Sequence, residues 1–213
     1  MMYSIKELFI IFMIYSFFGW VYEVIGKLIT EKKFINRGFF IGPYLPIYGV
    51  GAVFMIILLD KYVDDPLTLF IMSVLLFSSI EYLTSFFLEK LFNARWWDYT
   101  KYKFNINGRI CLETMVPFGL TGLFAMYILN PAIIRCLEAT PDIIVTIISI
   151  ILLIIIIIDM ILTTTIMINI KGTIKKVKKD NTEEITQKVK ELIMQTNKLR
   201  KRILKSFPKL KIK

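Results

Sequence analysis

Residues 143–168 form an apolar run that no small water-soluble fold could bury. Isoleucine and leucine fill most of this segment, and Asp159 is its only charged residue. A helix of this length exceeds the roughly 20 apolar residues that cross about 30 Å of hydrocarbon. Four further long apolar runs and an apolar content of 56% exclude a soluble globule, a disulfide-rich scaffold and an intrinsically disordered chain. The sequence therefore predicts a polytopic membrane protein.

The expected fold class is all-α, a bundle of about five transmembrane helices with an additional cytosolic amphipathic helix. The predicted spans are 5–29, 40–59, 67–88, 112–130 and 143–168. The first run lacks a cleavage site made of small residues, so we expect it to remain as a membrane anchor rather than to be removed as a signal peptide. We expect the chain in the plasma membrane of a bacterial cell, as a multi-pass protein.

The loops between these runs alternate in positive charge. Residues 30–39 and 89–111 carry several lysines and arginines, whereas 60–66 and 131–142 carry one each. Because Lys and Arg are retained on the cytosolic side during insertion, this alternation places the N-terminus outside and the C-terminus in the cytosol. The two cysteines then fall on opposite sides of the membrane, so we expect both thiols to be free.

The second run opens with the residues Gly42-Pro43-Tyr44-Leu45-Pro46. Two prolines three positions apart disfavour a continuous helix, and only about fourteen apolar residues follow Pro46. Non-helical backbone at membrane depth is tolerated only against protein or a water-filled cavity. Two interpretations remain open here, a broken helix that lines a site and a tight interfacial turn before a tilted helix.

Five acidic residues lie inside the apolar runs or at their edges. They are Glu23, Glu81, Glu89, Glu113 and Asp159. A carboxylate at the centre of a spanning helix costs roughly 2.5–3.5 kcal/mol, so each one requires a partner, a proton or water. The predicted topology places all five in the cytosolic half, on the same side as the loop arginines Arg37, Arg95 and Arg109. The two readings are buried ion pairs that fix the packing and a cytosol-facing cavity that binds a charged or zwitterionic molecule.

The loop at 89–111 is unusually rich in aromatic and polar residues. Its tryptophans and tyrosines are typical of the headgroup level of a membrane, which favours an interfacial loop. Asn107-Gly108 is a strong turn signal and Asp98 offers the arginines a local partner, which favours an ordered lid. The predicted solute-binding residues are Glu23, Arg37, Glu81, Glu89, Arg95, Asp98, Asn105, Asn107, Arg109 and Asp159. The sequence contains no histidine and no metal-ligand spacing, so we expect no metal or other cofactor.

An alignment of the chain against itself at an offset of 58 residues places Glu23 on Glu81 and Arg37 on Arg95. Both copies lie where an apolar run meets the loop that follows it. A parallel repeat of two helices would give this pattern, and a chance match in a biased composition is the alternative.

Several motifs resemble a known family. They are Gly19-Trp20-x-x-Glu23, Asn36-Arg37-Gly38-Phe39, Gly42-Pro43-Tyr44-x-Pro46-Ile47-Tyr48-Gly49, Arg95-Trp96-Trp97-Asp98-Tyr99 and Phe104-Asn105-x-Asn107-Gly108-Arg109. The chain resembles, over residues 10–125, the bacterial membrane proteins described as putative ABC-transporter type IV. Phe118-Gly119 departs from the Trp-Gly pair common in that family. The resemblance implies a permease. These 213 residues contain no G-x-x-x-x-G-K-[ST] loop, so a separate ATPase subunit would supply the energy.

The chain divides by charge into a bundle, residues 1–170, and a basic cytosolic tail, residues 171–213. The tail carries a net charge of +11, whereas the rest carries −1. Apolar residues recur at helical steps between 183 and 204, and this pattern predicts a basic amphipathic helix. Such a helix suits the anionic inner leaflet of the lipid bilayer, and a partner helix is the alternative. We expect no nucleic acid as a partner.

Three functions remain open from the sequence. The first is a transporter permease or transport-associated subunit with a polar site in the cytosolic half of the bundle. The second is a non-transporting membrane scaffold or regulator. The third is an enzyme acting on lipid headgroups, which the lack of histidine and of a paired nucleophile and base disfavours. We therefore expect a protein that is not an enzyme.

Overall fold

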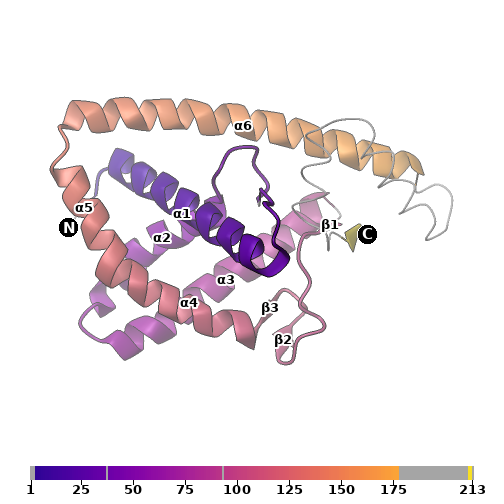
Figure 1. Ribbon diagram of the computed structural model, residues 1–213, viewed down its shortest axis with the longest axis horizontal. Helices are drawn as coiled ribbons and strands as arrows, with labels where there is room; N and C mark the ends of the chain where they lie inside the picture. Colours follow the sequence, from indigo (N-terminus) through magenta and orange to yellow (C-terminus); the bar gives the residue numbers. More distant parts are fainter. Residues whose placement is uncertain (1–2, 37, 93, 178–210, 213) are drawn as a thin grey trace.

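A computed structural model describes residues 3–36, 38–92, 94–177 and 211–212 of the chain. The described part is mostly helical (Figure 1). Its helices are α1 (Ile5–Glu31), α2 (Pro46–Leu59), the 3-10 turn η1 (Asp60–Tyr62), α3 (Pro66–Phe92), α4 (Leu112–Phe124), the π-helix η2 (Ala125–Leu129), α5 (Asn130–Glu138) and α6 (Asp142–Val177). Two short antiparallel pairs join β1 (Ala94–Arg95) to β4 (Lys211–Ile212) and β2 (Asn105–Ile106) to β3 (Ile110–Cys111).

Four helices in the described part are long and apolar enough to cross a membrane. They cover Ile5–Glu31, Pro66–Leu91, Leu112–Glu138 and Asp142–Ile166. These helices confirm a multi-pass helical membrane fold. The remaining predicted span, 40–59, is helical only over the fourteen residues of α2, which measure about 21 Å at 1.5 Å per residue. The non-helical opening that its prolines predict is confirmed.

The predicted loop at 131–142 is wrong over most of its length, because α4, η2 and α5 continue as helix to Glu138. Pro131 lies in the first turn of α5, where its missing N–H costs little. The π-helical turn η2 precedes it and carries the chain past the proline without a break in the helical path.

One end of the bundle, here called the Lys6 end, collects the beginning of α1 and the turns at residues 60–65 and 139–141. The side chain of Lys6 in α1 pairs with Asp142 at the start of α6. The pKa of Tyr3 is raised, first by partial burial and then by the nearby carboxylates of Asp60 and Glu138. Residues far apart in sequence therefore meet at this end.

Helix α2 runs back along α1 from the opposite end, in close contact. The Leu45 N–H donates to the Ser16 carbonyl over 2.8 Å. A Cβ atom on Gly49 would collide with the Phe12 carbonyl and the Ser16 hydroxyl, and one on Gly19 with the ring of Tyr48. The missing side chains of these two glycines let the helices approach this closely.

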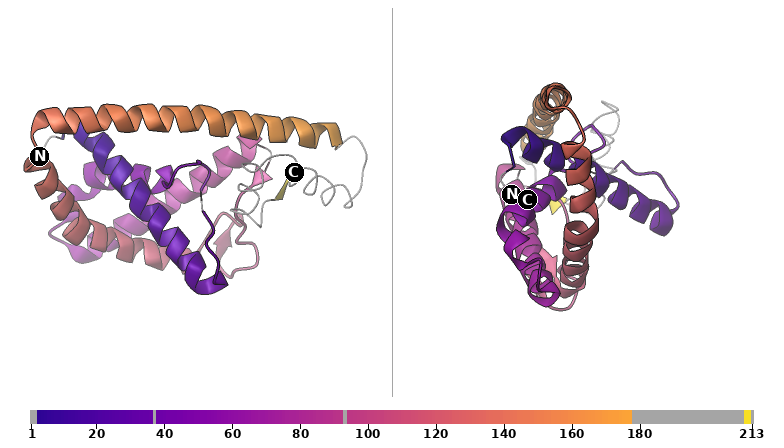
Figure 2. Two further views of the ribbon diagram at one scale, coloured as in Figure 1. Left: turned by 45° about the horizontal axis from the view of Figure 1, so that its top comes forward. Right: turned by 90° about the vertical axis from the view of Figure 1, so that its left-hand side faces the viewer.

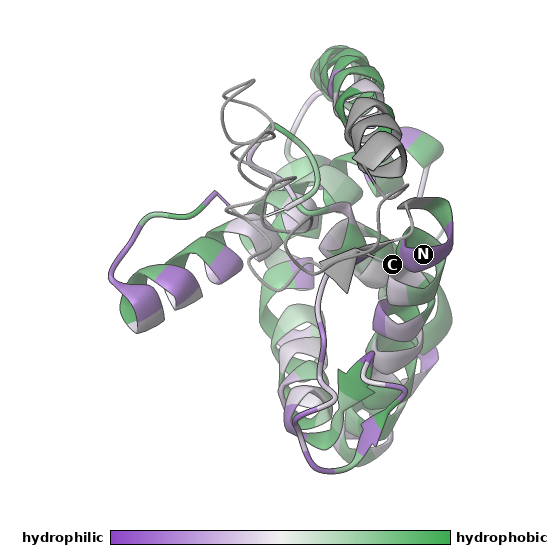
Figure 3. Ribbon diagram, turned by 90° about the vertical axis from the view of Figure 1, so that its right-hand side faces the viewer, coloured by the Kyte–Doolittle hydropathy of each residue, from purple (hydrophilic) through white to green (hydrophobic). Residues whose placement is uncertain are grey.

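The hydrophobic core fills the half of the bundle near the Lys6 end. Its buried members are Ile11, Tyr15, Ala52, Met55, Ile56, Leu59, Leu69, Ala125, Met126 and Ile133, from α1, α2, α3, η2 and α5. Helix α3 packs along α4, α2 packs between α1 and α3, and α6 lies against α1. The C-terminal part of α1 projects sideways from the other helices (Figure 2). The helices are hydrophobic over most of their length, whereas hydrophilic residues gather at the end of α1 and in the loop after α3 (Figure 3).

The glycine contacts predict that Gly49→Ala lowers the free energy of unfolding by about 1–3 kcal/mol, because the added methyl group meets backbone that cannot move aside. Gly26→Ala is the matched control, since a Cβ atom there meets nothing within 4 Å and alanine favours helix by up to about 1 kcal/mol. Unfolding midpoints in detergent, followed by circular dichroism, measure both. Equal midpoints for the two variants would contradict the close α1–α2 packing.

Candidate functional site

The buried and partly buried carboxylates Glu23, Glu81, Glu89 and Asp159 lie with their partners toward the end of the bundle opposite Lys6, here called the Glu89 end. They form three groups, which we name after their carboxylates. The Glu89 group joins α3 to the loop 94–111, the Glu23–Glu81 group lies among α1, α2, α3 and that loop, and the Asp159 group joins α6 to the segment before α2.

In the Glu89 group, one carboxylate holds two guanidinium groups. Oε2 of Glu89 lies 3.1 Å from Nε of Arg95 and 2.8 Å from Nη2 of Arg109. The three side chains are only 10–14% exposed. Arg95 also reaches Asp98, at 3.8 Å, and Arg109 donates to the Ser85 hydroxyl over 3.1 Å. The predicted compensation of a helix acid by loop arginines is confirmed for Glu89.

The turn that carries Arg109 is fixed by backbone geometry. Gly108 has φ +65°, and a Cβ atom there would crowd Thr100, Asp98 and Arg95, so this turn requires glycine. The Asn105 side chain accepts from the Gly108 N–H over 2.9 Å, and Asn107 donates to the Tyr82 hydroxyl over 2.8 Å.

Other contacts place the loop on α3. Nε1 of Trp97 donates to the Arg109 carbonyl over 3.0 Å, and the Arg109 guanidinium lies over the rings of Tyr82 and Phe86. The loop therefore packs against the end of α3.

The Glu23–Glu81 group pairs carboxylates with tyrosines. The Tyr48 hydroxyl donates to Oε1 of Glu23 and the Tyr99 hydroxyl donates to Oε1 of Glu81, each over 3.1 Å. Burial raises the pKa of Tyr99 well above its ordinary range, and the charges of Glu81 and Glu23 raise it further. Both carboxylates therefore lie near the same phenol. Oε2 of Glu81 is buried and has no hydrogen-bond partner among the described residues.

In the Asp159 group, four donors surround a single carboxylate that is 7% exposed. The N–H groups of Ile41 and Gly42 donate to it over 2.9 and 2.7 Å. The hydroxyls of Tyr44 and Thr163 donate over 2.5 and 2.8 Å. This carboxylate is well satisfied by its neighbours, and it attaches the segment before α2 to the middle of α6.

The structure separates the predicted site residues by role. Asn105 and Asn107 shape the turn, whereas Arg95, Asp98 and Arg109 surround Glu89. The prediction that arginines compensate the other helix acids is wrong for Glu81 and Asp159, whose described partners are hydroxyls and backbone amides. Arg37 lies outside the described residues.

The sequence reasoning missed three tyrosines as partners of the acids, Tyr44, Tyr48 and Tyr99. Aromatic residues near the ends of spans usually act as interfacial anchors, and their type alone does not show which carboxylate they reach. The Pro-Tyr-x-Pro-Ile-Tyr string at the start of α2 was the available signal. Tyr44 lies in non-helical backbone, which at membrane depth must face protein, and Tyr48 follows it in the first turn of α2.

The groups differ in what they can do chemically. The Glu89 and Asp159 groups are balanced by their neighbours and hold elements together. The Glu23–Glu81 group has two carboxylates near each other and an unpartnered oxygen atom, so it can accept further hydrogen bonds or a positive charge. Among the described residues, no set of three Cys, Asp or Glu side chains is arranged to hold a metal ion. The two cysteines are free, as predicted.

One feature of the structure is consistent with the alignment of the chain against itself at an offset of 58 residues. Glu23 and Glu81, which the offset aligns, meet in one group. The segments that follow their helices differ, since 94–111 contains strands and the described residues between α1 and α2 contain none.

Comparison with known proteins gives one match. The family model described as putative ABC-transporter type IV matches residues 10–164, which include α1 from residue 10, all of α2 to α5, and α6 as far as Thr164. No curated protein and no solved structure matches the chain.

The Glu89 group predicts a large difference between two glutamate substitutions. Glu89→Gln leaves two buried guanidinium groups without their shared counter-charge and is expected to lower the free energy of unfolding by about 3 kcal/mol. Glu31→Gln is the matched control, because its pair with Lys27 is an exposed i, i+4 contact worth no more than about 0.5 kcal/mol. Thermal unfolding in detergent compares them, and a Glu89→Gln midpoint within a degree of the control would show that the group does not hold the loop.

Proposed function

Because this chain belongs to the putative ABC-transporter type IV family, we propose that it is a membrane subunit of a transport system and not an enzyme. The Glu23–Glu81 group is its solute-binding site. A separate ATPase subunit supplies the energy from the cytosolic side, since the chain lacks a phosphate-binding loop of its own.

The buried, unpartnered oxygen of Glu81 carries this proposal. A carboxylate inside a spanning helix is costly, and one that serves only packing is expected to be satisfied by its neighbours, as Asp159 is. Glu81 receives one hydroxyl from Tyr99, and Glu23 lies close by. A solute with a positive charge or with hydrogen-bond donors would supply the partner that Oε2 of Glu81 lacks.

The group lies where a solute-binding site is expected in a membrane protein. The first turn of α2, directly after the non-helical segment, forms one side through Tyr48, and the loop after α3 forms another through Tyr99. Interrupted helices supply binding groups at membrane depth in many transporters. This arrangement supports the broken-helix interpretation of the second run.

We further propose that the backbone crosses the membrane five times. The segment before α2 lies beside Asp159, and the turn after α2 lies at the Lys6 end beside Tyr3. Helix α2 and its non-helical lead-in therefore connect the two ends of the bundle, although α2 alone is short. The charge alternation of the loops then places the Lys6 end outside the cell and the Glu89 end in the cytosol.

The basic tail and its amphipathic helix remain part of the proposal. Residues 178–210 lie outside the described part of the chain. Their positive charge suits the anionic inner leaflet, and a position at the end of α6 would bring them to the cytosolic surface.

The proposed site predicts selective binding of cationic solutes. The purified chain in detergent is screened by thermal shift against cationic, zwitterionic and anionic metabolites. A cationic or zwitterionic solute should raise the unfolding midpoint of the wild type, and Glu81→Gln or Glu23→Gln should reduce the apparent affinity at least tenfold. Glu113→Gln, in the first turn of α4, is the matched control and should bind normally. A shift that survives both substitutions would remove the group from the site, and no shift with any solute would favour a scaffold.

The proposed orientation predicts the labelling of a native cysteine. Cys136 is exposed near the Lys6 end and Cys111 is buried. A membrane-impermeant maleimide should therefore label right-side-out vesicles of the wild type, and Cys136→Ser should abolish the signal. A Lys101→Cys variant in the Cys136→Ser background should react only after permeabilisation, because position 101 lies in the loop at the Glu89 end. Labelling of position 101 in sealed vesicles would reverse the orientation.

A further inference from the structure

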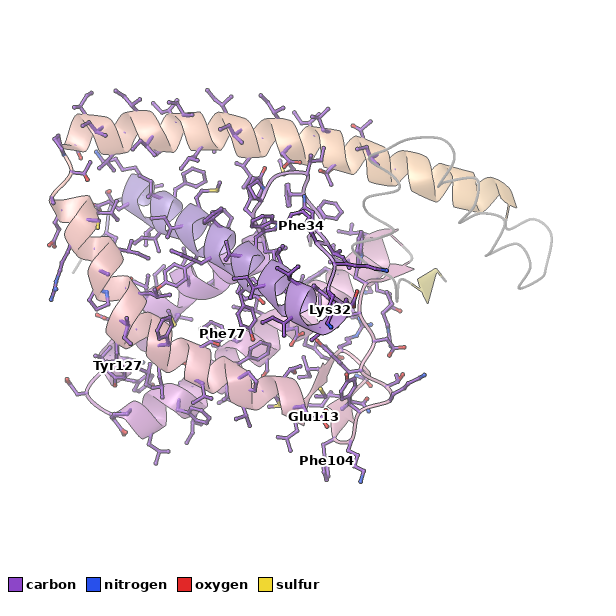
Figure 4. The ribbon with its side chains drawn as sticks, in the orientation of Figure 1. Lys32, Phe34, Phe77, Phe104, Glu113 and Tyr127 are labelled. Atoms are coloured by element: carbon purple, nitrogen blue, oxygen red, sulfur yellow. The ribbon has the colours of Figure 1, made fainter. Side chains whose placement is uncertain are left out.

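The loop after α3 ends in a projecting segment, residues 101–106, here called the loop tip. Phe104 is 79% exposed and Ile106 is 52% exposed, although both side chains are apolar. Lys101 and Lys103 precede them in the sequence and are exposed as well. Figure 4 shows Phe104 at the outer edge of the protein, pointing away from the bundle, near Glu113 at the start of α4.

The backbone holds Phe104 in an unfavourable conformation. Its φ angle is +50°, in the left-handed region that bulky side chains rarely adopt. A residue is held in this way only where its surroundings impose it, and such positions concentrate where a segment contacts a ligand or partner. The Phe104 side chain is 79% exposed, so burial inside the protein does not offset this backbone strain.

The loop tip is positioned by hydrogen bonds and not by apolar packing of its own. The Asn105 side chain donates to the Tyr102 carbonyl over 2.8 Å and accepts from the Gly108 N–H over 2.9 Å. The neighbouring Arg109 is tied to Glu89. The projecting phenylalanine is therefore presented on an ordered base.

The position of the loop tip relative to the bilayer follows from the helix that comes next. Strand β3 (Ile110–Cys111) leads directly into α4, which begins the candidate span Leu112–Glu138. Leu112 and Val116, in the first two turns of α4, are about half exposed and apolar, as expected of side chains that face lipid. The loop tip thus lies beside the level at which hydrocarbon begins.

The composition of the loop tip matches this level. Phenylalanine and isoleucine enter the boundary between headgroups and acyl chains, while lysines at the same depth attract anionic headgroups. Among the residues that the structure describes, neither Lys101 nor Lys103 forms an ion pair, so both ammonium groups are available to phosphates. A purely apolar protein partner would leave these charges unmatched.

We propose that the loop tip is an interfacial anchor, in which Phe104 and Ile106 insert into the bilayer boundary and Lys101 and Lys103 bind anionic phospholipid headgroups. The contact keeps the loop, and with it Tyr99 and the arginines around Glu89, at a fixed depth. This inference depends on the chain spanning a membrane and does not depend on the identity of any transported solute.

The test measures the depth of the loop tip in a bilayer. The full chain with Cys136→Ser carries a nitroxide label at position 106, through Ile106→Cys, so that Phe104 stays in place and Cys111 remains buried. The protein is placed in nanodiscs of phosphatidylcholine with phosphatidylglycerol, and collision rates with oxygen and with a water-soluble nickel complex are measured. Ile147→Cys on α6 is the hydrocarbon reference, and Asp64→Cys in the turn before α3 is the water reference.

The expected result is a label at position 106 that favours oxygen over nickel at least threefold more than position 64 does. The double variant Lys101→Gln, Lys103→Gln should reduce this ratio in the anionic nanodiscs and leave it unchanged in nanodiscs of phosphatidylcholine alone. A label as accessible to nickel as position 64 would overturn the proposal, because the loop tip would face the cytosol. A label shielded from both reagents would also overturn it, in favour of a protein contact. An unchanged ratio in the double variant in both lipids would overturn the role of the lysines.

Discussion

In hydrocarbon, a carboxylate must find its partners inside the protein, and the Glu89 end of this bundle is organised around that requirement. Glu89 meets it with two guanidinium groups, and Asp159 meets it with two backbone amides and two hydroxyls. Each solution draws a loop onto a helix. The loop 94–111 lies against α3 because its arginines pair with Glu89. The segment before α2 lies against α6 because its backbone amides donate to Asp159.

The Glu23–Glu81 group stands apart from these two because one oxygen of its Glu81 carboxylate has no hydrogen-bond partner among the described residues. Tyrosine hydroxyls reach it from two segments, Tyr48 from the first turn of α2 and Tyr99 from the loop after α3. A group that draws its members from several elements can change its geometry more readily than a group within one helix. The balanced groups beside it would keep those elements attached while it did so.

The helices of this fold follow from apolar run lengths, and α1, α3 and α6 lie where the runs place them. Pro46 and the apolar residues after it also define the fourteen-residue α2 correctly. The end of the fourth span does not follow from the length of its apolar run. Pro131 indicates the end of a helix, but it lies in the first turn of α5, directly after the π-helix η2. The candidate site was likewise predicted only in part. The sequence places Glu89 on the same side as three loop arginines, and two of them, Arg95 and Arg109, pair with it.

The tyrosine partners could not be read from the sequence, because a phenol near a membrane boundary serves equally well as a lipid anchor or as a donor to a carboxylate. Only the path of the backbone distinguishes Tyr44, which reaches Asp159, from Tyr48, which reaches Glu23. The attachment at Asp159 also has a mechanical consequence. Helix α6 is joined to α1 at one end by Lys6 and Asp142 and to the segment before α2 by Asp159, and its remaining length extends past that second joint. Helix α6 is therefore attached at two points. A displacement of its part beyond residue 159 would move Tyr44 and, four residues further along the chain, Tyr48.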